Sequence, residues 1–325
     1  MTTPFKFAAA VALAACAATS AWAQGASDWR PSKPVRIIVP IVGSTNDVLA
    51  RLIGPELQKA LGQPFVVENR AGASGVIGSD LVAKAPADGY TFHITDSGPM
   101  TILPHMRKLG YDPLSSFTPI SMVGGGGVVV VVLPTSKATD MKSLVELAKK
   151  DPKNWSYGTS GVGGVGHLAG EQFKAAAKLD IGHIPYKGGS PAITELLGGH
   201  VPVLFSSLGS AASHIRAGKL RALADSSSKR SSMFPDVPTM AEAGFPGFDA
   251  SIWFGIVGPA GLPKEVMDKW VPAMASVLKD PEVIAAIKRE GYDPMPMTPQ
   301  QTTERIKSDF ELWGKTVRSA NIKAD

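Results

Sequence analysis

Short β-branched runs alternate with amphipathic stretches along most of this chain. Residues 35–39 form the first such run, and residues 48–61 follow with apolar side chains at helical spacing. Because parallel strands need a crossover connection, usually a helix, this order predicts an α/β fold of mostly parallel sheets flanked by helices. Further strands are expected at 65–67, 90–94, 155–158, 182–185, 201–205 and 220–224, and further helices at 75–85, 144–150, 166–177, 192–197, 264–278, 282–290 and 300–319.

One long apolar run, residues 120–133, breaks the alternation. Four glycines at 124–127 are followed there by five valines at 128–132. The run is either a bulged core strand or a strand that crosses between two lobes with its hinge at the glycines, and we favour the crossing. Residues 251–257 would then be the return crossing.

The length of the chain also favours two lobes, because 325 residues exceed the usual size of one domain. The crossings predict a first lobe of residues 24–127 and 255–325, and a second lobe of residues 128–254. The last three expected helices would pack on the first lobe.

The N-terminal segment is typical of an export signal. Lys6 precedes an apolar stretch, and Ala21-Trp22-Ala23 is a small-residue cleavage site. Residues 1–23 are therefore expected to be a cleaved signal peptide, which places the mature protein in the periplasm. The alternative is a lipoprotein site at Leu13–Cys16, which would leave Cys16 lipidated. Cleavage after Ala23 would remove Lys6 and the single cysteine, so the formal charge would fall from +5 to +4.

Several classes of function are disfavoured by composition and motif. The positive charges are spread along the chain, which argues against a nucleic-acid partner. A single cysteine excludes a disulfide framework and a thiolate metal site, and the six histidines show no i,i+4 pair for zinc. The segments 72–75 and 158–161 both lack the last glycine of a nucleophile elbow. We therefore expect no catalytic residue, no metal and no cofactor.

The sharpest local pattern is the glycine-rich segment 158–167, which follows an expected strand and opens an expected helix. Its glycines fit a dinucleotide fingerprint, but the next strand ends in Tyr186-Lys187, where that fold needs an acid. The segment is either a tight turn alone or an anion site built from N–H groups and hydroxyls at a helix start. The candidate ligand-binding residues are Thr159, Ser160, Gly161, Gly163 and His167.

A second strand-to-helix loop follows the first expected strand, at residues 40–47. It carries four successive residues able to cap a helix, which is more than one helix start needs. Capping alone is the simpler interpretation; a second anion-binding helix start, facing the first across a cleft, is the functional one. The candidate residues here are Val42, Gly43, Ser44, Thr45, Asn46 and Asp47.

Three other strand ends carry polar candidates. Lys187 lies in the loop 186–191, where it could add positive charge to an anion site, although an exposed lysine is the simpler interpretation. Ser206 and Ser207 end another expected strand and could present two hydroxyls to the cleft. Asp96 could favour a ligand that carries an ammonium or hydroxyl group, or could be a loop cap only.

Eight stretches of the chain together resemble the Bug-type solute receptors of tripartite tricarboxylate transporters. The resemblance implies a two-lobed periplasmic binding protein that closes around a small carboxylate and delivers it to membrane transport subunits. It also implies that backbone amides, hydroxyls and waters of the loops 41–47 and 159–164 hold the carboxylate. The stretches are residues 34–40, 66–73, 87–91, 167–171, 185–188, 196–199, 217–224 and 235–239.

The first loop departs from the family pattern. Where the family has a glycine-rich run, this loop has a single glycine, Gly43, and it is one residue shorter than the family's loop. Ile41 and Val42 stand where the family has small residues or proline. Our prediction is a non-catalytic, monomeric receptor for an organic mono- or dicarboxylate. Ser44, Thr45, Asn46 and the 159–163 loop would donate to the carboxylate, and Asp47 would order its loop. The alternative is a periplasmic receptor that presents the bound carboxylate to a signalling protein.

Overall fold

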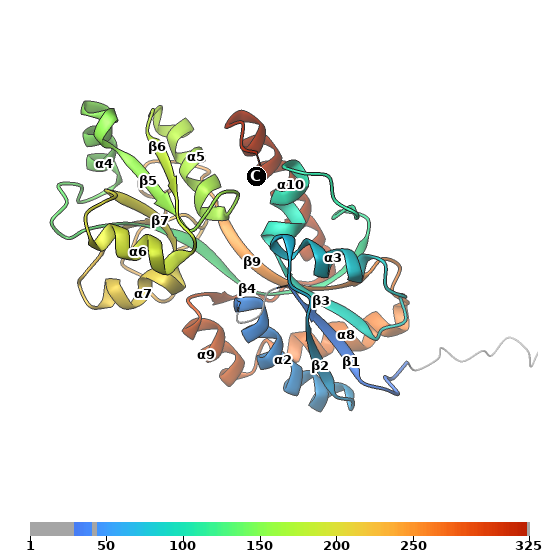
Figure 1. Cartoon of the computed structure of the whole chain (residues 1–325). Helices are drawn as coiled ribbons and strands as arrows, with labels where there is room; N and C mark the ends of the chain where they lie inside the picture. The colour runs from blue at the N-terminus through green and yellow to red at the C-terminus, as the bar shows by residue number, and fades with distance from the viewer. Residues whose placement is uncertain (1–28, 41–43, 324–325) are drawn as a thin grey trace, which may run out of the picture.

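The computed structural model describes residues 29–40 and 44–323, which form two α/β lobes joined by long strands (Figure 1). In the first lobe, β1 lies between β2 and β3 and runs parallel to both. Helices α2, α8 and α9 pack on one face of this sheet, and α3 packs on the other. The elements are β1 (Val35–Val39), α2 (Thr45–Leu61), β2 (Phe65–Asn69), η2 (Ala73–Gly75), α3 (Val76–Ala83), β3 (Thr91–Asp96), η3 (Gly98–Ile102), η4 (Leu103–His105), α8 (Lys264–Val277) and α9 (Pro281–Arg289).

The second lobe has the same layered plan, with β5 parallel to both β6 and β7. The valines of β4 (Phe117–Val132) alternate between its two faces: Val129 and Val131 pack with α6 and α7, while Val128, Val130 and Val132 pack with α4 and α5. The elements are α4 (Met141–Lys150), η5 (Pro152–Asn154), β5 (Ser156–Thr159), α5 (Val165–Ala177), β6 (Gly182–Pro185), α6 (Gly189–Leu197), β7 (Val203–Ser207), α7 (Leu208–Arg216) and β8 (Arg221–Asp225).

Two antiparallel strands cross between the lobes, β4 (Phe117–Val132) and β9 (Ser251–Pro259). β4 pairs with β9 as far as Gly127, and from Val128 onward it pairs with β7 and β8. A short strand, β10 (Asp293–Pro294), also pairs with β4. The predicted crossing is therefore present. Register shifts that mark bulges lie on both sides of the glycines: against β9 between Pro119 and Ser121 and between Met122 and Gly124, and against β8 between Val130 and Val131.

The four glycines of β4 have a different role from the backbone freedom expected of them. None has a left-handed φ, and all lie within the strand. Two of them allow close approach instead: a Cβ at Gly127 would lie 2.1 Å from Asp225 Oδ1, and one at Gly125 would lie 2.8 Å from the Ile252 carbonyl oxygen. The proposed hinge and the lobe boundaries remain predictions, although β4 changes partner at residues 127–128.

Helix α10 (Pro299–Ser319) corrects the expectation that the last three helices pack on the first lobe alone. Ile306 lies in a core cluster with Ile38 and Trp253, whereas Trp313 lies in the second lobe's cluster with Phe173. Its apolar stripe is long enough to cover both lobes in turn. α10 is thus a third connection between them.

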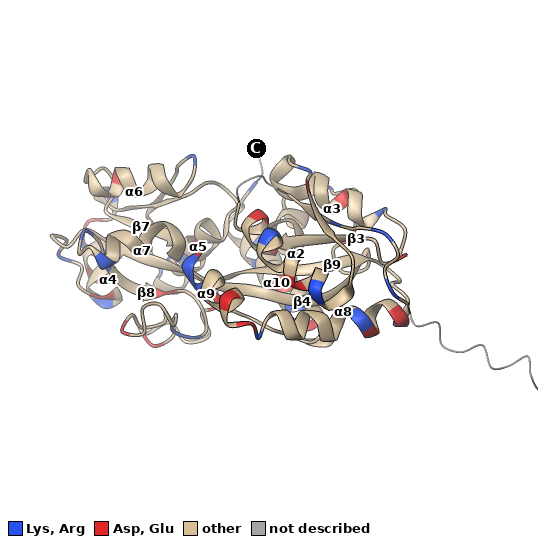
Figure 2. Ribbon diagram, turned by 90° about the horizontal axis from the view of Figure 1, so that it is seen from below, with Lys and Arg blue, Asp and Glu red and all other residues tan. Residues whose placement is uncertain are grey.

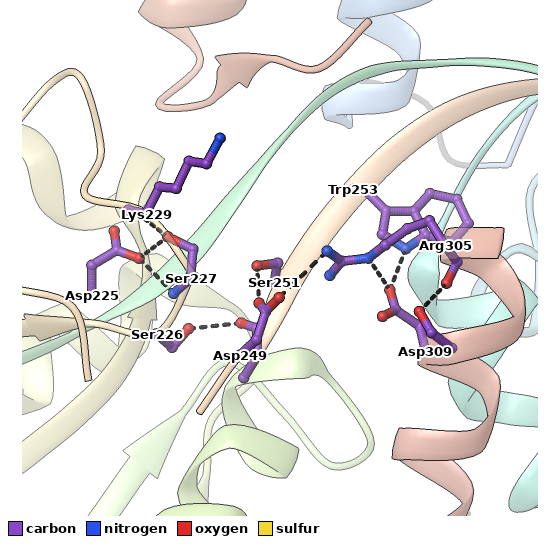
Figure 3. A network of polar contacts seen from close by, with 11 residues as sticks. Asp225, Ser226, Ser227, Lys229, Asp249, Ser251, Trp253, Arg305 and Asp309 are labelled. Atoms are coloured by element: carbon purple, nitrogen blue, oxygen red, sulfur yellow. Dashed lines mark hydrogen bonds and ion pairs between the residues drawn. The ribbon is translucent and has the colours of Figure 1, made fainter. Parts of the chain in front are cut away.

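A polar network holds these connections together at the crossing (Figure 3). Arg305 Nε donates to Asp309 Oδ2 (2.8 Å), and Arg305 also forms an ion pair with Asp249, just before β9. Asp309 accepts a second bond, from Trp253 Nε1 on β9 (2.8 Å). Nearby, Ser226 Oγ accepts from the Val128 N–H and donates to the Ala250 carbonyl. The network therefore ties α10 to β9, and the end of β8 to both crossing strands.

Charge is dispersed over the surface of this fold. In Figure 2, Lys and Arg alternate with Asp and Glu over both lobes, and neither sign forms a continuous stripe in that view. Within residues 29–40 and 44–323, no helix is long and apolar enough to cross a bilayer. The expected signal peptide, 1–23, and Cys16 lie outside the described residues.

Candidate functional site

The candidate residues lie at the carboxyl ends of four strands. Ser44 follows β1, Asp96 ends β3, Thr159 ends β5, and Ser207 ends β7. Within each lobe the two strands concerned run in the same direction, so their ends lie at one edge of that sheet. This is the edge where open α/β sheets bind ligands.

The first loop leads into α2, whose N-cap is Ser44: its hydroxyl accepts the Asp47 N–H (3.4 Å). Asn46 Nδ2 donates to the Ile94 carbonyl (3.3 Å), which ties the helix start to β3. The Asp47 carboxylate receives Arg51 Nε (3.0 Å) and Asn69 Nδ2 (3.2 Å). The buried side chains of Asn46 and Asp47 therefore hold the start of α2 in place. Val42 and Gly43 lie outside the described residues.

Asp96 lies beside this helix start. Burial raises the pKa of its carboxyl to about 6, while hydrogen bonds from the Gly98 N–H (2.8 Å) and Asn46 work in the opposite direction. The carboxyl is thus both a loop cap and a group that can take up a proton near pH 6. An adjacent ligand oxygen could accept that proton in a hydrogen bond.

The second loop joins β5 to α5, and its N–H groups are partly occupied. Thr159 Oγ1 accepts the Gly161 N–H (3.2 Å), and His167 Nδ1 accepts the Gly163 N–H (3.1 Å). Gly161 and Gly163 have φ values of 149° and 73°, which a residue with a Cβ rarely adopts. Since both glycine donors bond within the loop, a bound anion would have to replace those bonds or use the other N–H groups.

His167, which accepts the Gly163 N–H, is the first ring of a stack of three buried or half-buried side chains. Its ring stacks on His183 at 3.8 Å, and the His183 ring stacks on Tyr157 at 4.8 Å. His183 Nε2 is 2.7 Å from Thr159 Oγ1, and the Tyr157 hydroxyl donates to Glu171 Oε1 (2.7 Å). The rings therefore form a platform under the glycine-rich loop, and His167 is 93% buried there, with 7% exposed.

The histidine platform predicts a loss of stability in acid. Burial, followed by the charge of His167, lowers the pKa of His183 from 6.5 to about 4. Between these values the unfolded chain binds more protons than the folded one, so stability falls as pH decreases from 6.5 toward 4. The thermal unfolding midpoint should be lower at about pH 4.5 than at about pH 7, and His183→Gln should reduce this difference. His200→Gln, an exposed site, is the matched control.

If His183→Gln and the unaltered protein lost equal stability on acidification, the platform would not be the cause. The fully buried His93 also has a pKa lowered to about 4, by burial, and burial lowers the pKa of His167 and of His105, so part of the pH dependence should remain in the variant.

The remaining predicted residues lie close to the second loop. The Tyr186 N–H donates to the Thr159 carbonyl (2.9 Å) and the Gly188 N–H to the Ser160 carbonyl (3.1 Å), which places Lys187 alongside it. Ser206 and Ser207 instead make local bonds: Ser206 Oγ donates to the Ser207 carbonyl, and Ser207 Oγ donates to Ser210 Oγ. Their hydroxyls mainly shape the start of α7.

Two glycines that are not among the candidate residues allow close backbone contacts near the candidate loops. A Cβ at Gly166 would lie 2.7 Å from the Phe205 carbonyl oxygen, so α5 can sit against β7 only with glycine there. Gly291 similarly approaches Gly209 at the start of α7, and the neighbouring Tyr292 packs edge-on against Phe254 in the first lobe's core cluster. The segment 291–292 thus touches both lobes, and no local pattern in the sequence indicates this.

The comparisons with known proteins agree with this arrangement. The model of the tripartite tricarboxylate transporter family receptor, TctC, matches residues 49–322. The chain belongs to this family. Protein BugT of Bordetella pertussis is 39% identical over 300 residues, covering 91% of this chain and 92% of BugT. The predicted Bug-type resemblance is therefore confirmed.

Two similar solved structures carry ligands. R. palustris Rpa4515 with adipate is 33% identical, with a TM-score of 0.76, and covers 90% of this chain and 99% of that one. MatC from Rhodopseudomonas palustris with bound malate is 28% identical, with a TM-score of 0.72, over 88% and 99%. A third solved structure, that of the periplasmic binding protein BugD, is 32% identical with a TM-score of 0.72, over 91% of this chain and 100% of that one. This likeness confirms the two-lobed periplasmic binding protein fold predicted from the sequence.

Proposed function

We propose that this TctC-family receptor binds a small organic mono- or dicarboxylate between its lobes and delivers it to the membrane subunits of a tripartite tricarboxylate-type transporter. The observation that carries the proposal is the pair of polar helix starts, one in each lobe, at the carboxyl ends of β1 and β5. Helix N-termini and hydroxyls favour anions. The adipate and malate held by the two relatives support a carboxylate as the anion.

Thr45, Ser160 and the loop N–H groups around Gly161 are the proposed carboxylate donors, with Asn46 and Asp47 holding the first helix start in place. Ligand binding would close the lobes about the crossing strands near residues 124–128. The protein would act in the periplasm after export, as a monomer that releases its ligand unchanged. Recovery of a bound carboxylate without turnover after long incubation would support that last point.

Thermal unfolding against a panel of carboxylates, amines and sugars tests this function. At a hundred times its dissociation constant, a ligand should add about 2.7 kcal/mol to the free energy of unfolding. We expect at least one carboxylate to raise the unfolding midpoint. A rise with amines or sugars only would reject the proposal. Loss of uptake of that carboxylate after deletion of the receptor would then separate transport from a signalling role.

A further inference from the structure

A cavity of about 470 Å³ lies between the lobes, next to the glycine-rich loop. The second lobe contributes Gly161 and Lys187 to its wall, and the first contributes Ser74, Met106 and Arg107. Each lobe thus supplies one cation, and the described lining residues include no carboxylate. Two cations without a compensating acid favour an anionic occupant.

Arg107 lines this cavity, and its charge is paired with no carboxylate in the part of the chain that the structure describes. Its Nη2 donates to the Ala73 carbonyl (3.1 Å), but its Nε is buried and has no hydrogen-bond partner in the part of the chain that the structure describes. A buried charged donor without a partner is costly. Arg107 is therefore held in place through Nη2, while its charge has no carboxylate partner among the described residues.

The loop held by Arg107 has an unfavourable backbone conformation. Ala73 and Ser74 have φ values of 49° and 55°, in the left-handed region that residues with a Cβ avoid. Such residues persist where surrounding contacts fix them, and they are often found at ligand sites. The bond from Arg107 to the Ala73 carbonyl is one of these contacts. It places the exposed Ser74 hydroxyl at the cavity.

Lys187 lies on the opposite wall of the cavity and belongs to the second lobe. The flanking N–H groups of Tyr186 and Gly188 fix its backbone to the Thr159 and Ser160 carbonyls. Its side chain is exposed and makes no hydrogen bond or ion pair with the described residues. The ammonium is thus held at the proposed carboxylate loop without a protein partner.

We propose that this cavity is a second anionic subsite, which takes the far carboxylate of a dicarboxylate whose near carboxylate is held by the 159–161 loop. The inference rests on the proposed function and narrows its ligand class. Gly161 belongs to both sites, so one short ligand can span them. The Arg107 guanidinium, the Ser74 hydroxyl and the Lys187 ammonium are the donors for the far carboxylate. A monocarboxylate leaves both cations unpaired.

Calorimetric titration with matched acids tests the subsite: succinate against butyrate, and adipate against hexanoate. We expect at least one of the two dicarboxylates to bind at least about tenfold more tightly than the monocarboxylate of equal length. The reason is that charge-assisted hydrogen bonds to the second carboxylate add to its affinity. Lys187→Gln should remove most of this preference and leave monocarboxylate binding within about twofold. Arg107→Gln should do the same. Arg107→Gln also removes the bond that holds the strained loop. Lys187→Gln breaks no described contact and is therefore the decisive variant.

Lys108→Gln removes an exposed charge next to Arg107 and is the matched control, expected to bind as the unaltered protein does. Equal dicarboxylate affinity in the unaltered and Lys187→Gln proteins would overturn the subsite. So would an equal loss for both classes of acid. In either case the proposed function would stand, because carboxylates still bind the unaltered protein. If none of the acids bound it, the subsite and the proposed function would both be rejected.

Discussion

Replacing Ser160 with tryptophan should abolish the rise in unfolding midpoint that a bound carboxylate produces. Ser160 is exposed at the end of β5, where the loop turns toward α5, and only its backbone carbonyl is tied down, by the Gly188 N–H (3.1 Å). A large side chain fits there without disturbing the core, but it fills the space above the helix start. The full stabilisation, about 2.7 kcal/mol at a hundredfold ligand excess, should therefore be lost.

The matched control is Ser276→Trp, an exposed serine on α8 in the first lobe. It adds the same side chain to the surface away from the cleft and should keep the full ligand-induced shift. Both variants should unfold at nearly the same midpoint without ligand. If Ser160→Trp retained the shift, the carboxylate would bind somewhere other than the glycine-rich loop.

The order of strands and helices could be predicted from the sequence because each element carries its own local pattern. The run 35–39 became β1 with the predicted bounds, and the apolar stripe of 48–61 became α2, which begins three residues earlier, at Thr45. Helix α7 was missed, because its short segment, Leu208–Arg216, is rich in serine and alanine and has only a narrow apolar stripe. Where the local signal is weak, packing against β4 and β7 decides the structure.

Only the parts of the candidate site that have a local sequence pattern could be predicted. Helix starts and glycine-rich turns are local, so the loops around Ser44 and Thr159 could be located. Arg107 lies at the same cavity as Gly161 only through the tertiary fold, and no spacing in the sequence connects the two residues. Nor could a sequence indicate that the Gly163 N–H is already used by His167. Such occupancy depends on distances between side chains that the fold alone sets.

Replacing Asp309 with alanine should cost about 3 kcal/mol of stability, the largest structural effect we expect. Asp309 is 4% exposed and is the acceptor for both Trp253 Nε1 and Arg305 Nε, each at 2.8 Å (Figure 3). Its loss would leave the fully buried indole N–H without a partner and a mostly buried guanidinium with only Asp249. Removing one member of a buried pair is costly because the other remains desolvated.

Denaturant unfolding of Asp309→Ala and Asp268→Ala measures the effect against a matched loss of charge. Asp268 pairs with Lys264 on the surface of α8, where both side chains are more than half exposed, so its removal should change stability by less than about 1 kcal/mol. Asp309→Asn should fall between the two, since its amide oxygen can still accept the Trp253 N–H while the charge that faces Arg305 is gone. Similar midpoints for all three variants would mean that α10 is held to β9 by apolar packing, with the polar network contributing little.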